Sequence, residues 1–358
     1  MFIYKISKYE KDFRNWVWIA YLRHLWRGEF KQKTEKRILT HEQKQKARQF
    51  FDPIIGKKID LLYHDFYTQK TGVFCADYIP DDIYYAYVDP FYNDWEAAKI
   101  LDNKCYYRIL LRDIKQPELI ALRINGYWYV EKDGELTLTS VHNIIQIIHG
   151  KECFIKAATN SEGGHGVFYL HDKTEENEIE EAINSVWGDA VVQFALKQHP
   201  ALSTINPSSV NTIRILSFLD EDGSVRIVSS ILRIGVSGSK VDNASSGGIT
   251  CGITSDGKLK QYAFSAKGDR FDRHPDSGIP FECMVIPKFE EIKQIVKKVH
   301  PRFSHFRLLS WDFAVSEENE PVLIEVNLRY GELDFHQLNN GPLFGEETRR
   351  IVGKVFGK

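Results

Sequence analysis

One stretch of the chain, FIKAATNSEGGHGVFYL at residues 154–170, restricts the possible folds most. An apolar segment carries a single lysine, Lys156, then enters a polar loop with three glycines before an apolar segment returns. A lysine rarely lies among core residues unless an anionic group meets its ammonium. Glycines let a backbone approach a ligand closely and expose its N–H groups. The stretch therefore predicts two strands, 153–158 and 166–171, joined by a loop that receives phosphate.

A second informative segment is the predicted hairpin LLSWDFAVSEENEPVLIEVN at residues 308–327, which turns at SEEN. Glu325 and Asn327 lie two residues apart on its second strand, so their side chains share a face. Pairing around the turn would bring Asp312, on the first strand, opposite them. Oxygen ligands without sulfur or imidazole favour Mg²⁺, and Mn²⁺ suits the same set. A solvated sheet face is the alternative, but together with the lysine and the glycine loop the triad predicts a site for a nucleoside triphosphate.

The order of these features excludes two common nucleotide-binding classes. The chain has no G-x-x-x-x-G-K-[ST] of a P-loop and no H-R-D or D-F-G of a protein kinase. A helix lysine, a strand lysine, a glycine-rich hairpin, a hinge strand and a distal Asp…Glu-x-Asn follow one another instead. This order resembles the ATP-grasp superfamily, and within it the sugar-transfer-associated ATP-grasp proteins, over residues 100 to 345 or so. The resemblance implies an α/β (α+β) ATP-grasp fold, with two α+β lobes gripping ATP after a mostly helical N-terminal region.

The resemblance also implies which residues bind ATP. Lys104 and Lys156 are similar to the two phosphate-contacting lysines, although Asn103 replaces the acidic residue that usually precedes the first. A loop that closes over the triphosphate and a hinge that binds adenine and ribose complete the implied site: Ser161, Gly163, Gly164, His165 and Gly166 in the loop, and Gln193, Phe194, Leu196 and His199 in the hinge.

Metal and catalytic roles follow from the same resemblance. Asp312, Glu325 and Asn327 match the metal triad, with Glu325 bridging two Mg²⁺ ions. Arg214 and Arg233 match arginines that hold the γ-phosphate and the acyl-phosphate, and Lys156 joins them as the implied catalytic set. Read as isolated strand residues, the two arginines would equally suit surface ion pairs.

Two further residues are candidates for substrate binding. Asn243, in VDNASSGGI, matches a polar residue ahead of the superfamily's glycine pair, although this polar segment also suits a plain connection. Arg329 directly follows the metal ligands and is placed to meet an anionic group.

The remaining pattern predicts a mixed chain of three parts, with boundaries at residues 1–100, 101–200 and 201–358. The first is a helical or mixed domain, the second the lid and nucleotide-binding lobe, and the third the C-terminal lobe with the metal and substrate site. Apolar spacing predicts helices at 13–26, 35–51, 95–112, 139–149, 175–187 and 286–300. Aromatic and β-branched residues between turn signals predict strand and loop at 58–74 and 81–91.

Charge and cysteine content restrict the partners and the compartment. The net charge of the 358 residues is −2, which gives no global attraction to nucleic acid. The five cysteines show no C-x-x-C spacing, which indicates a reducing compartment without a disulfide framework or a zinc site. The start lacks the apolar core of a signal peptide, and no run of about 18 apolar residues occurs. We therefore expect a cytoplasmic protein.

Residues 1–50 differ from the rest, with 13 lysines and arginines against five acidic residues. Within them, FRNWVWIAYLRHLW (13–26) is typical of a helix with apolar side chains on more than one side. We prefer the interpretation that this helix is packed against other elements from several directions. The alternative is a peripheral contact with an anionic membrane or with another assembly protein.

The resemblance implies an ATP-dependent ligase that joins a carboxylate to an amine or another nucleophile through an acyl-phosphate, forming ADP and phosphate. A sugar or amino-acid building block of bacterial surface polysaccharide is the substrate that the family suggests. Two alternatives remain: a kinase of a sugar or lipid, and a non-catalytic nucleotide-binding partner, against which the three retained metal ligands argue. Neither the substrate pair nor the oligomeric state follows from the sequence.

Overall fold

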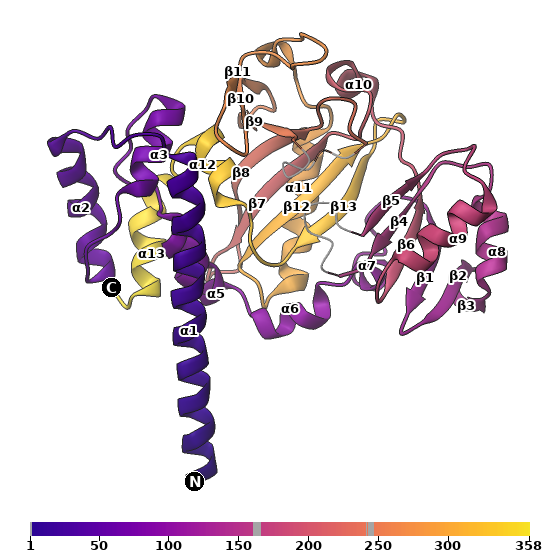
Figure 1. The fold of residues 1–358 in the computed structure, drawn as a ribbon, viewed down its shortest axis with the longest axis horizontal. Helices are drawn as coiled ribbons and strands as arrows, with labels where there is room; N and C mark the ends of the chain where they lie inside the picture. The colour runs from indigo at the N-terminus through magenta and orange to yellow at the C-terminus, as the bar shows by residue number, and fades with distance from the viewer. Residues whose placement is uncertain (1, 160–165, 241, 243–246) are drawn as a thin grey trace.

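The computed structural model describes residues 2–159, 166–240, 242 and 247–358. A helical region, a seven-stranded sheet and a six-stranded sheet lie side by side (Figure 1). Every strand pair in both sheets is antiparallel. The expected α+β architecture with a helical N-terminal region is confirmed.

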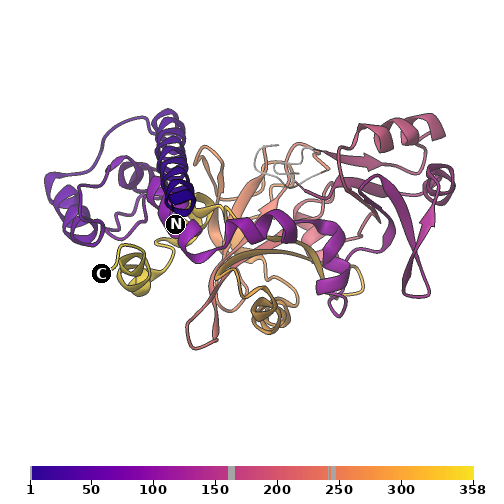
Figure 2. The same cartoon turned by 90° about the horizontal axis from the view of Figure 1, so that it is seen from below.

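The helical region begins with a long helix that continues well beyond the body of the protein (Figure 1). Thr40 starts the second helix because its side chain accepts a hydrogen bond from the Gln43 backbone and the Gln43 side chain accepts one from Thr40 N–H. The helices are α1 (Phe2–Lys33), α2 (His41–Ile55), α3 (Leu62–Thr71), α4 (Asp81–Ile83), the π-helix η1 (Tyr84–Val88), α5 (Asp89–Tyr92), α6 (Trp95–Leu101) and α7 (Lys104–Leu110). Seen from below, α6 and α7 run beneath the seven-stranded sheet toward the six-stranded one (Figure 2).

The strands expected within 58–74 and 81–91 are wrong, because these segments form α3 and the helical run α4–η1–α5. Residues 62–67 are all buried, so α3 has no polar side and shows no 3.6-residue alternation in the sequence. Aromatic content alone then favours the strand interpretation. The expected helix at 95–112 is two helices, since Asn103 caps a new one.

The six-stranded sheet has the order β3-β2-β1-β6-β4-β5. Its strands are β1 (Leu119–Ile124), β2 (Tyr127–Lys132), β3 (Glu135–Thr139), β4 (Cys153–Ala157), β5 (Val167–Leu170) and β6 (Ala190–Phe194), and α8 (Val141–Ile148) and α9 (Glu176–Ser185) cover one face. Cys153, Ile155 and Ala157 point toward these helices and are buried. Because side chains alternate along a strand, Phe154 and Lys156 project from the opposite face.

The seven-stranded sheet has the order β11-β10-β9-β8-β7-β12-β13. Its strands are β7 (Thr212–Leu219), β8 (Val225–Ile234), β9 (Ile249–Ile253), β10 (Leu259–Ser265), β11 (Arg270–Phe271), β12 (Leu308–Val315) and β13 (Pro321–Asn327). The helices of this part are α10 (Pro200–Ile205), η4 (Phe281–Cys283), α11 (Phe289–Val299), η5 (His300–Phe303), α12 (Leu333–Asn340), η6 (Gly345–Glu347) and α13 (Thr348–Val355). The apolar side of α11 packs with Ile213, Ile215 and Trp311 on one face of the sheet.

The opposite face of this sheet meets the helical region, where Leu216 and Phe218 pack with apolar residues of α2, η1 and α13. The Gln337 side chain of α12 accepts from Ile79 N–H and donates to Ile79 C=O, both at 2.9 Å. This amide pair joins residues 258 positions apart in the chain. Within the described ranges, no helix combines the length and apolar content that crossing a membrane requires.

Candidate active site

Strand pairing gathers charged residues on one face of the seven-stranded sheet. Arg214 lies opposite Asp312, which lies opposite Glu325, and Asn327 is two residues further along the same strand. Thr212, two residues before Arg214, lies opposite Arg233. Residues that face each other across strands share a face, so all these side chains project together. The hairpin register expected from the sequence is confirmed.

Asp312 is the centre of this group. Arg214 donates from Nε to Oδ1 at 2.8 Å and from Nη2 to Oδ2 at 2.6 Å, which is the bidentate geometry that a guanidinium prefers. Arg233 Nη1 and Asn327 Nδ2 each reach Oδ2 at 3.3 Å. Burial would raise the pKa of Asp312, but Arg214, Arg233 and Asn327 together outweigh this effect and hold the pKa below its usual value.

A second buried carboxylate supports the arginines. Asp242 lies 3.9 Å from Arg233 and accepts hydrogen bonds from the backbone and hydroxyl of Thr212. Burial raises the pKa of Asp242, while Arg233 and Thr212 oppose the shift. Asn243, the neighbouring substrate-binding candidate, lies outside the described residues.

Lys104 brings a cation to the other end of the triad. Its Nζ lies 2.7 Å from Oε1 of Glu325. Asn103 starts α7 by accepting from Cys105 N–H and donates to Asp189 through its amide, which a carboxylate at this position could not do. The Tyr107 hydroxyl donates to the Val326 carbonyl at 2.7 Å, so α7 is fixed to β13 beside the metal candidates.

Lys156 projects from β4 on the face away from α8 and α9. Its Nζ lies 3.5 Å from Oε1 of Gln193 and 5.4 Å from the centre of the Phe154 ring. Burial and the nearby Lys104 lower the pKa of Lys156 to about 8, while Glu325 and Asp242 oppose the shift. An anion between the two lysines would therefore relieve their repulsion.

A cavity of about 780 Å³ unites these groups. Both lysines, both arginines, all three triad residues and Arg329 line it. Beside the lysines, its wall is apolar and suits a flat aromatic base: Phe154, Phe194, Leu196, Val210 and Ile324. Of the hinge candidates, Phe194 and Leu196 line the cavity. Gln193 instead contacts Lys156, and His199 caps α10 by accepting from Ala201 N–H.

The expected closing loop falls mainly outside the described residues: Ser161, Gly163, Gly164 and His165. Gly166, at its end, is described and has φ +68°, a conformation that favours glycine. A Cβ there would lie 2.7 Å from the Trp187 ring, so the close approach also requires glycine.

Arg329 lines the cavity next to the triad and lies 3.3 Å from Oδ2 of Asp102. Burial raises the pKa of Asp102, and Lys104 and Arg329 oppose the shift. The guanidinium of Arg329 also lies 5.8 Å from the centre of the Tyr330 ring.

Several cavity residues have no counterpart in the sequence-based prediction. Glu332 contacts Arg214 Nη1, Asp242 supports Arg233, and α1 supplies part of the wall through residues 18–33. Asp242 directly precedes the candidate Asn243, and Glu332 lies five residues after Asn327, so proximity to the motifs was a usable signal. Nothing in α1 distinguishes its cavity side from an ordinary packed side.

The donor set fits a hard divalent cation. Asp312, Glu325 and Asn327 offer oxygen atoms from one sheet face, which suits Mg²⁺ or Mn²⁺. Among the described residues, no three histidine, cysteine, aspartate or glutamate side chains converge on a metal position. The triad contains two carboxylates and one amide, so a bound phosphate would have to complete the coordination, as is common for Mg²⁺.

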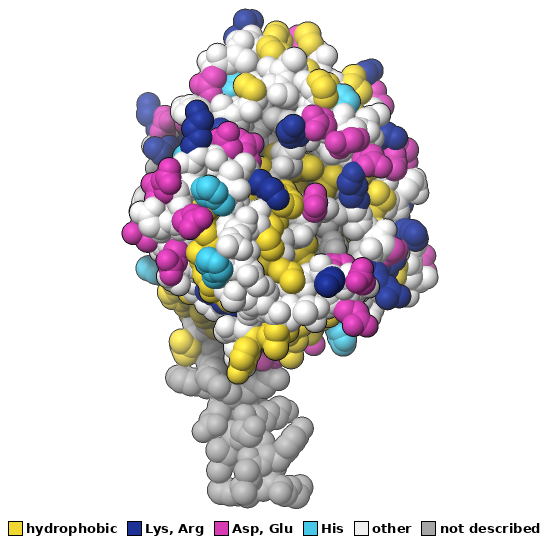
Figure 3. Space-filling model, turned by 90° about the vertical axis from the view of Figure 1, so that its right-hand side faces the viewer, with side chains coloured by type: hydrophobic (Ala, Val, Ile, Leu, Met, Phe, Trp, Pro, Cys, Tyr) yellow, Lys and Arg dark blue, Asp and Glu magenta, His cyan; other side chains and the backbone are white. Residues whose placement is uncertain are grey.

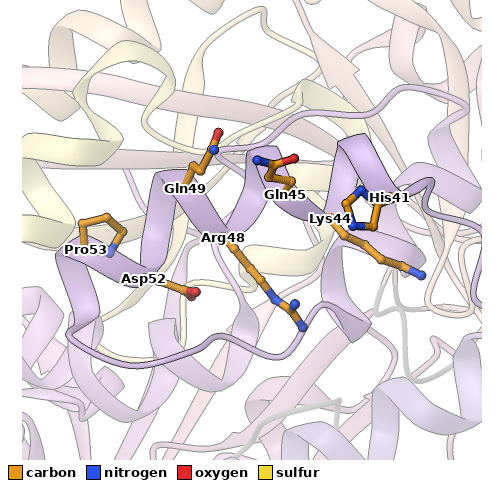
Figure 4. A pocket seen from close by; sticks show the side chains of 7 residues that line it. All are labelled: His41, Lys44, Gln45, Arg48, Gln49, Asp52 and Pro53. Carbon is orange, nitrogen blue, oxygen red and sulfur yellow. The ribbon is translucent and has the colours of Figure 1, made fainter.

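Two other surfaces formed by described residues show no such convergence. A hollow along α2 is lined by residues whose side chains point to different sides of one helix (Figure 4): His41, Lys44, Gln45, Arg48, Gln49, Asp52 and Pro53. On the face of the protein at the six-stranded sheet, lysine and arginine side chains alternate with aspartate and glutamate (Figure 3). The cavity between the two sheets is therefore the candidate active site.

Several solved structures are similar to the chain at low identity and with TM-scores under 0.5. The chain is 14% identical to the biotin carboxylase domain of Hydrogenobacter thermophilus 2-oxoglutarate carboxylase, solved with MgADP, ADP and bicarbonate (TM-score 0.42, covering 73% of this chain and 47% of that one). It is 17% identical to D-alanyl-alanine synthetase A of Vibrio cholerae (TM-score 0.41, 72% and 64%). It is 13% identical to a Campylobacter jejuni biotin carboxylase in complex with β-γ-ATP (TM-score 0.45, 74% and 48%).

The chain spans less than two thirds of the length of each of these proteins. No curated protein matches the chain. The model of the family described as Sugar-transfer associated ATP-grasp matches residues 85–352, which include every charged residue of the sheet-face cluster. The chain therefore belongs to the sugar-transfer-associated ATP-grasp family.

Proposed function

We propose that this chain is an ATP-dependent ligase that activates a carboxylate as an acyl-phosphate and transfers the acyl group to an amine or another nucleophile. One observation supports the proposal above all: Lys104 contacts Glu325, Arg214 and Arg233 contact Asp312, and Lys156 lines the same cavity. Such a cavity supplies cations for a triphosphate and oxygen ligands for its metal ion. Family membership supports ATP as the nucleotide.

In this proposal the nucleotide lies between the two sheets. The base packs in the apolar slot formed by Phe154, Phe194 and Ile324, and the phosphates lie between Lys104 and Lys156. Asp312, Glu325 and Asn327 would hold Mg²⁺, which would neutralise phosphate charge when bound. Lys104, whose Nζ lies 2.7 Å from Glu325, would contribute its positive charge to the phosphates.

The reaction requires positioning and charge neutralisation more than covalent chemistry from the protein. A carboxylate oxygen attacks the γ-phosphorus, the bond to the β–γ bridging oxygen breaks, and ADP leaves. The nucleophile then attacks the acyl carbon, phosphate leaves with the attacking oxygen, and the nucleophile loses a proton. Arg214 and Arg233 orient the planar carboxylate through their guanidinium donors. Two unit charges 4 Å apart interact by about 4 kcal/mol at an effective dielectric constant near 20, so each cation contributes substantially.

The finer parts of the proposal concern the substrate. We propose a sugar or amino-acid building block of bacterial surface polysaccharide as the substrate, and the family's association with sugar transfer supports the sugar part of this proposal. ADP release should be measured across a panel of carboxylates and amines that includes nucleotide sugars. A carboxylate labelled with ¹⁸O should deliver its label to the released phosphate.

The same label separates the alternatives. A kinase would leave the γ-phosphoryl group on a sugar or lipid hydroxyl, giving a stable phosphorylated product and no free phosphate. A non-catalytic partner would bind ATP without turnover. Unlabelled phosphate from a verified carboxylate substrate would contradict the ligase proposal.

A second proposal concerns residues 1–50, which carry the excess of basic residues. Trp16 and Val17 of α1 are 65% and 45% exposed, which favours insertion into the interface of an anionic membrane. Co-sedimentation with vesicles should increase with anionic lipid and decrease with salt and in the Trp16→Ser variant. Equal binding to neutral vesicles would contradict this contact.

A further inference from the structure

The cavity extends beyond the phosphate-binding groups to α1. This part of its wall consists of apolar residues on one side of the helix: Trp18, Tyr21, Leu22, Leu25 and Trp26. Trp18, Tyr21 and Leu25 are 44%, 52% and 47% exposed, although they line the same cavity as Arg214 and the triad. Large apolar side chains that remain this accessible inside a cavity are available to a ligand.

The polar residues at this end have a charge imbalance. Among the described residues that line it, Glu29, Glu332 and Asp334 share two cations, Lys33 and Arg214, and Arg214 also neutralises Asp312. Lys33 Nζ lies 2.6 Å from Glu29 and 3.6 Å from Asp334. Burial raises the pKa of Asp334, Lys33 opposes the shift, and Glu332 and Glu29 raise the pKa further. An added cation would relieve this repulsion.

Glu332 is held in a fixed position between the two ends of the cavity. Its carboxylate contacts Arg214, which also holds Asp312, and its side chain is 34% exposed. Tyr330 and Glu332 both have φ of +54°, which is unfavourable for residues with a side chain. Between them, a Cβ at Gly331 would lie 3.0 Å from Leu216 and Ser310, so the loop lies tightly against the sheet. Leu333 N–H donates to the Tyr85 hydroxyl at 2.9 Å and secures the loop from the other side.

We propose that the α1–α12 end of the cavity is the acceptor subsite, and that it takes a primary amine carried on an apolar or aromatic group. Glu332 receives the ammonium next to Arg214, and Trp18, Tyr21 and Leu25 pack against the carrier. This inference rests on the proposed ligase function and adds to it the chemical class of the nucleophile.

Charge complementarity selects the amine over the alternatives. An ammonium balances the surplus of carboxylates and interacts favourably with the faces of Trp18 and Tyr21. A neutral alcohol of the same shape gains the apolar contacts but not the charge interaction. A carboxylate of the same shape meets repulsion from Glu332 and Glu29, and is expected instead among Arg214, Arg233 and Arg329.

Three probes that share an aromatic ring and differ in their polar group test the proposal: benzylamine, benzyl alcohol and benzoate. Each is titrated into the full chain without ATP, and binding is followed by ligand-observed NMR. Benzylamine should bind about tenfold more tightly than benzyl alcohol, because only its ammonium forms a charge-assisted hydrogen bond with the Glu332 carboxylate. Glu332→Gln should reduce the ratio of the two affinities to near one. Both affinities are measured on the same variant, so a loss of folded protein would weaken both ligands equally and would leave their ratio unchanged.

Trp18→Ala should weaken benzylamine and benzyl alcohol to the same extent, while ATP affinity stays at the wild-type value. Trp16→Ala is the matched control, because Trp16 lies on the same helix outside the cavity lining. The proposal is overturned if benzylamine does not bind, if the alcohol binds as tightly, or if Glu332→Gln leaves the ratio unchanged. It is also overturned if Trp18→Ala has no more effect than Trp16→Ala. A failure of the ligase function would appear separately, as absent ADP release with amine binding intact.

Discussion

Arg214 contacts Asp312 with two parallel hydrogen bonds of 2.8 and 2.6 Å, and the same guanidinium contacts Glu332 with its remaining nitrogen. One side chain thus connects a metal candidate on β12 with the loop before α12. Since both Arg214 and Asp312 are buried, neither charge has water to replace a lost partner.

Arg214→Met should therefore lower the free energy of unfolding by about 3–5 kcal/mol, as expected when one member of a buried ion pair is removed. Arg226→Met is the control, because Arg226 pairs with Asp220 on the same sheet but is 38% exposed, and about 0–1 kcal/mol is expected there. Urea denaturation of both variants measures the difference. Equal losses would show that the Arg214–Asp312 contact does not stabilise the fold.

Glu325→Gln should abolish ATP turnover while the fold remains intact. The amide has lost the charge that a divalent cation requires, and it leaves Lys104 without its carboxylate partner. Glu320→Gln, on the same hairpin, removes an exposed pair with Lys115 and should retain activity. ADP release together with circular dichroism distinguishes the outcomes. Full activity of the Glu325 variant would remove the metal assignment.

ATP affinity should decrease as the pH rises above about 8, because the pKa of Lys156 in the free protein is lowered to about 8. Bound phosphate favours the protonated lysine and raises this pKa, so binding takes up protons between the free and bound values. ATP affinity has its full value at pH values below the pKa of Lys156 in the ATP-free protein. Above that pKa it falls by up to about tenfold per pH unit. Calorimetry in buffers of different ionisation enthalpy measures the proton uptake.

Two variants check this assignment. Lys156→Arg should flatten the pH profile between 7 and 9 without restoring full affinity, since a guanidinium stays charged but is bulkier. Lys156→Ala should weaken binding strongly at every pH. Unchanged affinity in the alanine variant would contradict the role of Lys156 in phosphate binding.

Gly166→Ala should destabilise the protein more than Gly188→Ala. Both glycines have positive φ, at +68° and +59°, so each alanine incurs a backbone cost of about 1–2 kcal/mol. Only at Gly166 would the new Cβ collide with a described side chain, the Trp187 ring at 2.7 Å, whereas nothing described lies within 4 Å at Gly188. Thermal unfolding compares the two. Equal shifts in Tm would mean that Trp187 moves aside without cost.

The sequence allowed the β12–β13 register and the projection of Lys156 to be predicted, because both depend on local alternation and a short turn. The contacts of Asp242 and Glu332 could not be predicted in this way. Each meets an arginine on a strand far away in the chain, and the pairing of β7 with β12 has no local signal. The helix at 62–71 was missed because a fully buried helix lacks a polar side. The cavity wall formed by α1 was missed because the residues that it meets, such as Asp334 beside Lys33, lie on α12 near the other end of the sequence.

The amide pair between Gln337 and Ile79 has a consequence for how the protein is made. During synthesis, Ile79 and the helices around it leave the ribosome long before α12, and β7 leaves before its neighbour β12. Contacts of such large sequence separation slow folding, since the intervening chain must be brought together first. The early helices therefore keep apolar surface uncovered during synthesis, and a nascent chain of this kind is exposed to aggregation until α12 has been made. We expect chaperone dependence in the cell to be greatest for chains that stop short of α12.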